Sequence, residues 1–124
     1  MAVEYQLSGD LLRLNLVGTY QADDVRQQFM KALEDPACPR EVALLLDVTR
    51  SESLAQRSVD DLRGVATFVG RFADRVRRRC AVVAAEDVHY GLARMAAVFS
   101  EGVGVEAQVF RKDDEALKWL FAKT

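Results

Sequence analysis

Two short apolar runs without polar alternation constrain the fold of this chain more than any other feature. They are VALLL at residues 42–46 and CAVVAA at residues 80–85. A strand whose successive residues are all apolar needs cover on both faces, which is typical of parallel sheets flanked by helices. Each run is followed by a segment with apolar residues at helical spacing. The pattern therefore predicts an α/β fold with helices packed on the sheet.

The N-terminal segment shows the alternation that these two runs lack. Apolar and polar residues alternate over residues 3–7 and again over residues 12–16, and a glycine-containing turn at residues 8–10 joins the two. This predicts a β-hairpin with one buried face, placed at an edge of the sheet. Residues 105–109 alternate in the same way, so we expect the last strand to lie nearer an edge too.

Four segments are predicted to be helices, because acidic or capping residues precede apolar residues at helical spacing. The first runs from Asp23 to the helix-ending Pro36, and the second from the capping residue Ser58 to Val76. The last starts at Asp113. The polar residues 48–57 are predicted to be a loop. The expected order is β-β-α-β-α-β-α-β-α, with a mixed sheet of about five strands in a single domain spanning residues 1–124.

The third helix is predicted to start at Asp87 as N-cap. Its expected buried stripe consists of Val88, Leu92, Met95, Ala96 and Phe99. Tyr90, Arg94 and Val98 lie off that stripe, as Phe68 and Trp119 do on their own helices. Apolar side chains outside a buried stripe indicate a groove or a dimer contact, or else the wide buried stripe of a helix that lies on a sheet.

Composition and charge exclude several classes of function. The net charge is −2, with 29% charged residues, and this balance favours neither nucleic acid nor an anionic membrane. The arginines at positions 75 and 77–79 are explained by a helix C-terminus and a solvated surface. With one histidine and two distant cysteines, Cys38 and Cys80, the sequence predicts neither a metal site nor a cofactor. It shows no secretion signal and no apolar run long enough to span a membrane, so we expect a cytoplasmic location.

The chain resembles the STAS domain, the module of sulfate transporters and anti-sigma factor antagonists, and most closely its SpoIIAA-like group of small bacterial proteins. Four segments carry this resemblance: residues 4–20, 42–49, 89–101 and 109–120. The architecture is also similar to the lipid-binding domain of Sec14-type proteins. The resemblance implies a STAS-like fold and a binding or regulatory module without catalytic activity. It also implies an apolar groove as the ligand site.

The chain departs from the antagonist-type STAS pattern in one respect. Those domains carry a phosphorylated serine in an Asp-Ser-Ser-Gly segment after the central strand, and this segment is absent here. Ser51, Ser53 and Ser58 lie in the corresponding region. A phospho-switch that uses one of them is therefore an alternative hypothesis, with a kinase as partner.

The leading hypothesis is a non-enzymatic module that binds an apolar small molecule or a protein partner. Asp47 lies at the carboxyl end of a predicted central strand, where ligands of α/β proteins bind, although such an aspartate also commonly accepts bonds from its own loop. Together with the residues off the helical stripes, this gives a predicted site of Asp47, Phe68, Tyr90, Arg94 and Met95. A homodimer is a further hypothesis for the same surface.

An enzyme using Asp47, Asp87 and His89 ranks last. Asp87 and His89 are two residues apart and so point to different sides of a helix start. Asp87 is better explained as a cap. Ser51 and Ser58 lack the GxSxG context of an activated nucleophile. The glycines at 102 and 104 follow a helix instead of a strand, the reverse of a dinucleotide-binding loop.

Overall fold

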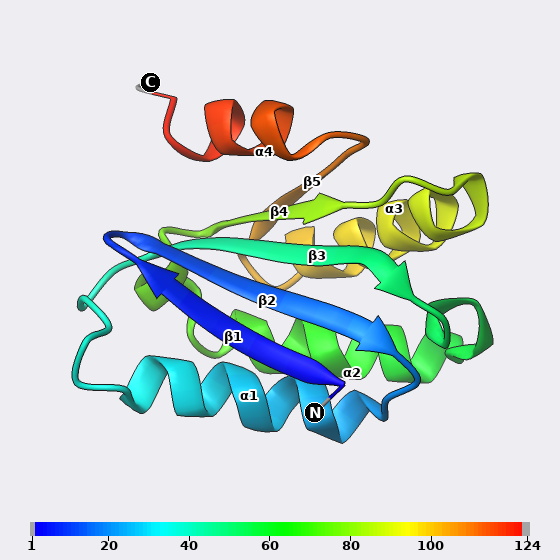
Figure 1. The fold of residues 1–124 in the computed structure, drawn as a ribbon, viewed down its shortest axis with the longest axis horizontal. Coiled ribbons are helices and arrows are strands. Elements are labelled where there is room, and N and C mark those ends of the chain that lie inside the picture. Colours follow the sequence, from blue (N-terminus) through cyan, green and yellow to red (C-terminus); the bar gives the residue numbers. More distant parts are fainter. Residues whose placement is uncertain (1, 123–124) are drawn as a thin grey trace.

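The computed structural model describes residues 2–122, which form a five-stranded mixed sheet with helices on both faces (Figure 1). The spatial order of the strands follows the sequence, β1-β2-β3-β4-β5. β1 and β2 form an antiparallel hairpin, and all later neighbours are parallel. The predicted fold class and element order are confirmed, and the hairpin and the last strand lie at the two edges as expected.

The strands and helices have the following bounds. The strands are β1 (Val3–Ser8), β2 (Leu11–Gly18), β3 (Ala43–Ser51), β4 (Arg79–Val83) and β5 (Glu106–Phe110). The helices are α1 (Ala22–Glu34), α2 (Val59–Gly70), α3 (Asp87–Glu101) and α4 (Asp113–Leu120), with short 3₁₀ turns η1 (Leu54–Gln56) and η2 (Ala73–Val76). No helix of the described residues is long and apolar enough to cross a membrane.

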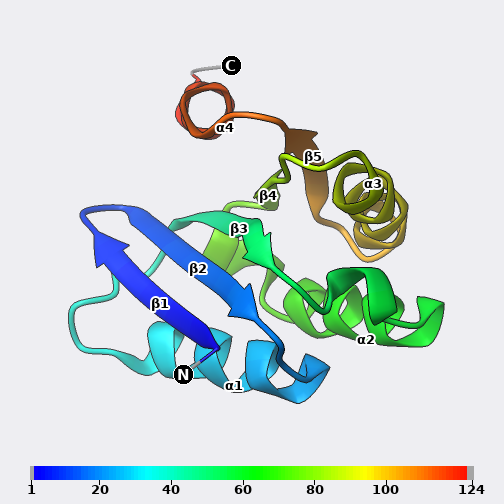
Figure 2. The same cartoon turned by 45° about the vertical axis from the view of Figure 1, so that its right-hand side comes forward.

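The two faces of the sheet are covered unequally (Figure 2). Helices α1, α2 and α3 pack on one face and bury the larger core, which includes Phe29, Leu12 and Leu44. Helix α4 lies on the other face and packs Ala116 and Leu120 against β3 and β4. The apolar runs in β3 and β4 are buried from both sides because they occupy the middle of the sheet. Parallel strands in that position need such cover.

Strand β3 is longer than the sequence predicts. It continues from Asp47 to Ser51, through residues expected to be a loop. The pairing with β2 shifts register between Asn15 and Val17 and then resumes, with Gly18 opposite Ser51. This irregularity carries the polar end of β3 beside β2. Val48 and Thr49 favour a strand, and backbone pairing with Val17 and Gly18 extends it through Arg50 and Ser51.

Helix α2 ends earlier than its periodicity predicts. Ser58 caps it as expected, since its Oγ accepts a hydrogen bond from the Asp61 amide at 3.0 Å. The helix stops at Gly70, and the chain continues as η2 to Val76. A Cβ at Gly70 would lie 2.6 Å from Val103 Cγ2, so only glycine allows the turn before β5 to pack this closely.

Helix α3 is rotated relative to the prediction. Its buried residues are His89 and Ala93, whereas the expected core residues Val88 and Met95 are 61% and 40% exposed. The expected N-cap was also wrong, because Glu86 occupies that position and Asp87 is the first helical residue. Small alanines, instead of the larger side chains, face the sheet. Phe121, which follows α4, is likewise 47% exposed.

Candidate functional site

An apolar cavity lies between the sheet and helices α2 and α3. Its volume is about 100 Å³. The floor consists of β-strand side chains such as Leu46, Cys80 and Val82, and the helix side is lined by Val65, Val69 and the small residues of α3. The α3 residues that face it are Ala93, Ala96, Ala97 and Ser100. The cavity exists because these side chains are too short to fill the space between two helices that pack on one sheet.

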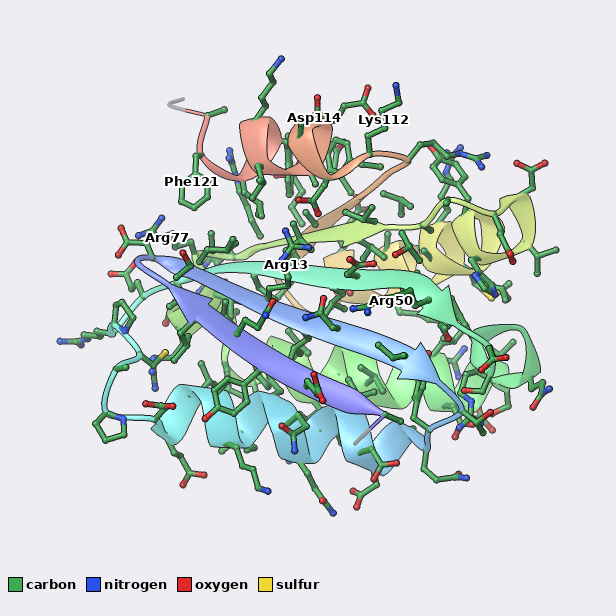
Figure 3. The ribbon with its side chains drawn as sticks, in the orientation of Figure 1. Arg13, Arg50, Arg77, Lys112, Asp114 and Phe121 are labelled. Atoms are coloured by element: carbon green, nitrogen blue, oxygen red, sulfur yellow. The ribbon has the colours of Figure 1, made fainter. Side chains whose placement is uncertain are left out.

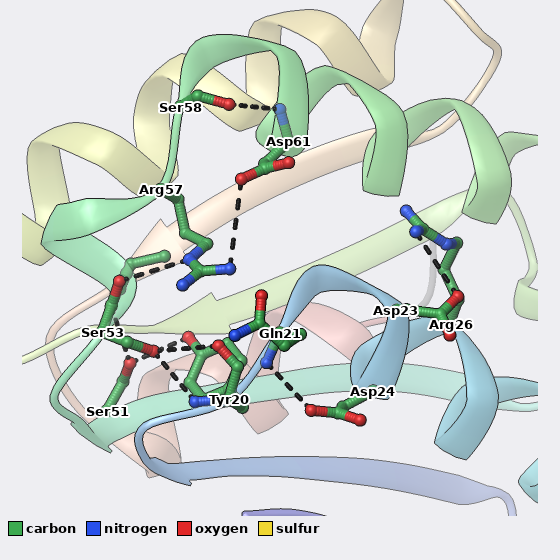
Figure 4. A network of polar contacts seen from close by, with 11 residues as sticks. Tyr20, Gln21, Asp23, Asp24, Arg26, Ser51, Ser53, Arg57, Ser58 and Asp61 are labelled. Atoms are coloured by element: carbon green, nitrogen blue, oxygen red, sulfur yellow. Dashed lines mark hydrogen bonds and ion pairs between the residues drawn. The ribbon is translucent and has the colours of Figure 1, made fainter.

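One end of the lining, which we call the mouth, carries three polar side chains that belong to one network of contacts (Figure 4). Tyr20, Arg57 and Asp61 line it together with Leu54. The hydroxyl of Tyr20 lies 2.8 Å from Ser51 Oγ, and its amide donates to Ser53 Oγ at 3.2 Å. These bonds attach the segment after β3 to the start of α1. Burial raises the pKa of Tyr20, so its phenol is neutral at physiological pH.

Arg57 is the only cationic side chain among the described residues of the lining. Its side chain is 13% exposed, and it lies 4.0 Å from an Asp61 carboxylate oxygen. Its Nε donates to the Ser53 carbonyl at 3.4 Å, and its guanidinium carbon lies 5.9 Å from the Tyr20 ring centre. All three contacts are long, so the guanidinium retains capacity for a further acceptor.

Cys80 also lines the cavity but is not an activated thiol. It is fully buried, and burial raises its pKa to about 12. At neutral pH it is protonated and acts as a small apolar side chain, as its place in the CAVVAA run predicts. Cys80 therefore contributes an apolar contact to the cavity and not a thiolate nucleophile.

The predicted site residue Asp47 lies on the opposite face of the sheet. Its Oδ1 accepts bonds from Thr49 at 2.9 Å (amide) and 2.6 Å (hydroxyl), the local role that the sequence suggested as an alternative. Its Oδ2 lies 3.4 Å from Arg13. Arg13, which is labelled in Figure 3, makes a bidentate pair with Asp113 at 2.8 and 2.7 Å. This cluster joins β2 and β3 to the start of α4, and the pairing lowers the pKa of Asp113.

The other four predicted site residues are not brought together. Phe68 packs edge-on against Phe29 and beside Phe72, between α1 and α2. Tyr90 lies beneath the guanidinium of Arg111, at 4.2 Å. Arg94 and Met95 are exposed on α3. The described lining of the apolar cavity includes none of the five residues predicted from the sequence.

The three serines differ in accessibility. Ser51 and Ser53 are 6% and 0% exposed and hold Tyr20, as described above. Ser58 is exposed, but its hydroxyl caps α2. A kinase would reach Ser51 or Ser53 only after the segment had left its place over the cavity.

The three residues of the catalytic hypothesis, His89, Asp87 and Asp47, each contact a different partner. His89 is 6% exposed, and its Nδ1 lies 3.7 Å from Glu86 without a hydrogen-bond partner among the described residues. Asp87 pairs with Arg111 at 2.8 Å, while Asp47 contacts Arg13 on the α4 side. Within residues 2–122, no cluster of three His, Cys, Asp or Glu side chains is placed to hold a metal ion.

Sequence reasoning missed Tyr20, Arg57 and Leu54 as cavity residues. Tyr20 follows the second predicted strand of the hairpin, and Arg57 lies in the predicted loop at residues 48–57. The one signal for the site was the row of small residues in α3, because alanines at helical spacing leave space where larger side chains would fill it.

Comparisons with known proteins bear on the family of the chain. No curated protein sequence matches it. A solved structure similar to this one is an uncharacterized protein of the DUF3478 family from Shewanella loihica PV-4, described as having a SpoIIAA-like fold. The two share 23% identity and a TM-score of 0.59, over 96% of this chain and 92% of the other. This likeness supports the fold. The SpoIIAA-like family matches residues 11–121, and the chain therefore belongs to the SpoIIAA-like family.

Proposed function

We propose that this protein is a non-enzymatic binding module whose ligand is a small apolar molecule with an anionic head group. The apolar part would occupy the cavity under α2 and α3, and the head group would pair with Arg57 at the mouth. The observation that supports this most is a cavity with an apolar interior and a single under-used cation at its opening. A regulatory role follows if ligand binding moves the segment after β3, which carries Leu54 and Arg57 of the mouth.

The size of the cavity limits the ligand. Apolar cavities of about 150 Å³ in proteins stay dry and bind benzene-sized molecules. The cavity here, about 100 Å³, is smaller, so it accepts a short branched or linear chain as it stands. A longer chain would have to displace α2 outward, and part of its binding energy would be spent on that movement.

Arg57 gives the proposal its chemical direction. A largely buried guanidinium is costly unless it is paired and hydrogen-bonded, and its carboxylate partner Asp61 lies at the 4.0 Å limit of an ion pair. A ligand carboxylate would provide a closer, charge-assisted partner. Tyr20 beside it is neutral and offers a hydroxyl already engaged with Ser51. The pairing therefore favours anionic over neutral or cationic head groups.

A titration with short- to medium-chain alkanoic acids tests this function. Calorimetry and native mass spectrometry should show saturable binding with one ligand per chain. Arg57→Gln should raise the Kd of the acid about tenfold, the effect of losing one charge-assisted bond, and that of the matching alcohol less than about twofold. Arg63→Gln serves as control because Arg63 is exposed on α2 and belongs to no described part of the cavity lining.

Two outcomes would contradict the proposal. One is the absence of saturable binding of every acid and alcohol in the series. The other is equal weakening of acid and alcohol by Arg57→Gln, which would mean that Arg57 maintains the fold of the mouth instead of pairing with the ligand.

A further inference from the structure

The outer face of α3 is apolar although nothing in the described chain covers it. Val88, Met95 and Val98 are 61%, 40% and 65% exposed. Gly91 lies on the same face, and a Cβ built there would meet no atom within 4 Å. These positions recur at spacings of three and four residues, so they form one continuous stripe along the helix. The stripe lies opposite Ala93, which faces the sheet.

The two flanks of this stripe differ in chemistry. One flank carries Arg94 and, seven residues later, Glu101, both exposed. Neither makes an ion pair with another described residue. The other flank carries Leu92 and Phe99, which are only partly buried in the core. The helix therefore presents an apolar strip with apolar groups on one side. The other side carries Arg94 and Glu101 and, nearer the N-terminus, Asp87, which pairs with Arg111.

We propose that a second copy of this chain docks on this stripe, with the two α3 helices packed antiparallel about a twofold axis. In antiparallel helix pairs, like flanks of the two helices face each other. An axis between Ala96 and Ala97 places Met95 of each helix against Val98 of the other.

The same register satisfies both flanks. It brings Arg94 of each copy close to Glu101 of its partner, which gives two reciprocal ion pairs. On the opposite flank it brings Leu92 of each copy close to Phe99 of the other.

Charge also excludes the neighbouring alternatives. An antiparallel register centred at Arg94, two to three residues away, sets the two Arg94 side chains opposite each other and Asp87 opposite Glu101. Like charges in those positions repel. In a parallel arrangement the charged flank of one helix lies against the apolar flank of the other. Arg94 then meets Leu92 or Phe99, and the charges of Arg94 and Glu101 stay unpaired. Of these arrangements, the proposed register is the one that places apolar groups against apolar groups and also pairs each Arg94 with a Glu101.

The expected association is weak. Each copy contributes little more than one helix face, which is at the lower end of specific interface sizes. We therefore expect a reversible dimer with a Kd on the order of 10–100 μM, populated only at high protein concentration. The interface does not include the cavity mouth, so dimerisation and ligand binding can be measured separately.

Sedimentation velocity over a concentration series tests the dimer, with charge reversal as the diagnostic. Arg94→Glu and Glu101→Arg should each raise the Kd about tenfold or more, because each turns two attractive pairs into two repulsive ones. The double variant, Arg94→Glu with Glu101→Arg, should restore the Kd to within about threefold of the original. Val98→Glu should abolish the dimer, whereas Val59→Glu on α2, whose valine is 47% exposed, should leave it unchanged.

Circular dichroism of each variant shows whether it is folded, and all four positions are exposed, so folding should be preserved. A monomer at every concentration would overturn the proposal, even if Val98 then proved to bind vesicles or another protein. A dimer that survives Val98→Glu would overturn it too, because it would use another surface. Failure of the double variant to recover affinity would refute the antiparallel register.

Discussion

Filling the apolar cavity should have two effects: it should raise the free energy of unfolding, and it should abolish binding of the proposed ligand. Ala96 lines the cavity from α3, and Ala96→Leu adds three carbon atoms towards a space of about 100 Å³. At about 24 cal/mol per Å³ of cavity, removal of the whole void is worth about 2.4 kcal/mol. Burial of three further carbons at about 0.8 kcal/mol each gives about the same figure.

The net effect should be smaller than this upper bound. Ordering a leucine side chain costs about 0.5–1 kcal/mol, and the cavity is not the exact shape of leucine. We expect Ala96→Leu to raise the free energy of unfolding by about 1–1.5 kcal/mol, which corresponds to a rise in Tm of about 3–5 °C for a chain of this size. Such a gain from a buried small-to-large substitution is uncommon, because well-packed cores are destabilised by it.

Urea unfolding followed by tryptophan fluorescence and circular dichroism measures the stability, and titration with alkanoic acids measures the binding. Lys31→Leu, which adds leucine to an exposed position of α1, controls for the effect of a new leucine on a helix. Destabilisation by Ala96→Leu of more than about 1 kcal/mol, the usual cost of overpacking, would show that the space is not there. Stabilisation with unchanged ligand affinity would show that the ligand binds elsewhere.

Two further predictions concern pH. Burial raises the pKa of the Cys80 thiol to about 12, above its ordinary value of 9.0, so the unfolded chain ionises first and stability falls as pH rises through that window. Above pH 9 the loss approaches about 1.4 kcal/mol per pH unit. Cys80→Ala should remove this slope in urea unfolding between pH 9 and pH 11, whereas Cys38→Ala, at a partly buried position, should leave it in place. The bond from Arg13 lowers the pKa of Asp113, which gives stability that is present above the unfolded pKa and is lost as pH falls through the lower folded value. Because the Asp113 side chain is 48% exposed, solvent screening leaves about 0.5 kcal/mol of this stability at pH 7. Asp113→Asn should therefore be less stable than the original chain at pH 7, and the deficit should shrink as the pH falls below the ordinary carboxyl value of 3.8. A deficit that does not change with pH would contradict the ion-pair explanation.

The order and type of the elements followed from the sequence because local signals agreed with the final structure. The apolar runs in β3 and β4 required cover on both faces, and α4 provides it on the second face. Ser58 caps α2, and acidic residues occupy the first turn of α1 as expected. The prediction was wrong at the ends of β3 and α2, because residues distant in the sequence determine where these elements end. Pairing with β2 lengthens β3, and Val103 packs on Gly70 at the end of α2.

The candidate site was far less predictable. Its mouth joins Tyr20 to Ser53, which are 33 residues apart in the chain, and no local pattern records such a contact. The cavity itself is a space between elements, so it depends on how closely α2 and α3 approach the sheet. The sequence showed only that α3 was rich in alanine.

Helix α3 is the clearest case of a feature that the sequence could not predict, namely which face of the helix is buried. Its apolar residues occur on nearly every side, so helical periodicity alone could not select the buried face. The sequence by itself determined that this segment is a helix after a doubly covered strand. Only the tertiary structure decided its rotation, because the packing of α3 against β5 and α2 turns Ala93 towards the sheet and leaves Met95 and Val98 at the surface. That rotation both leaves the cavity open beneath the helix and turns an apolar stripe outward to solvent.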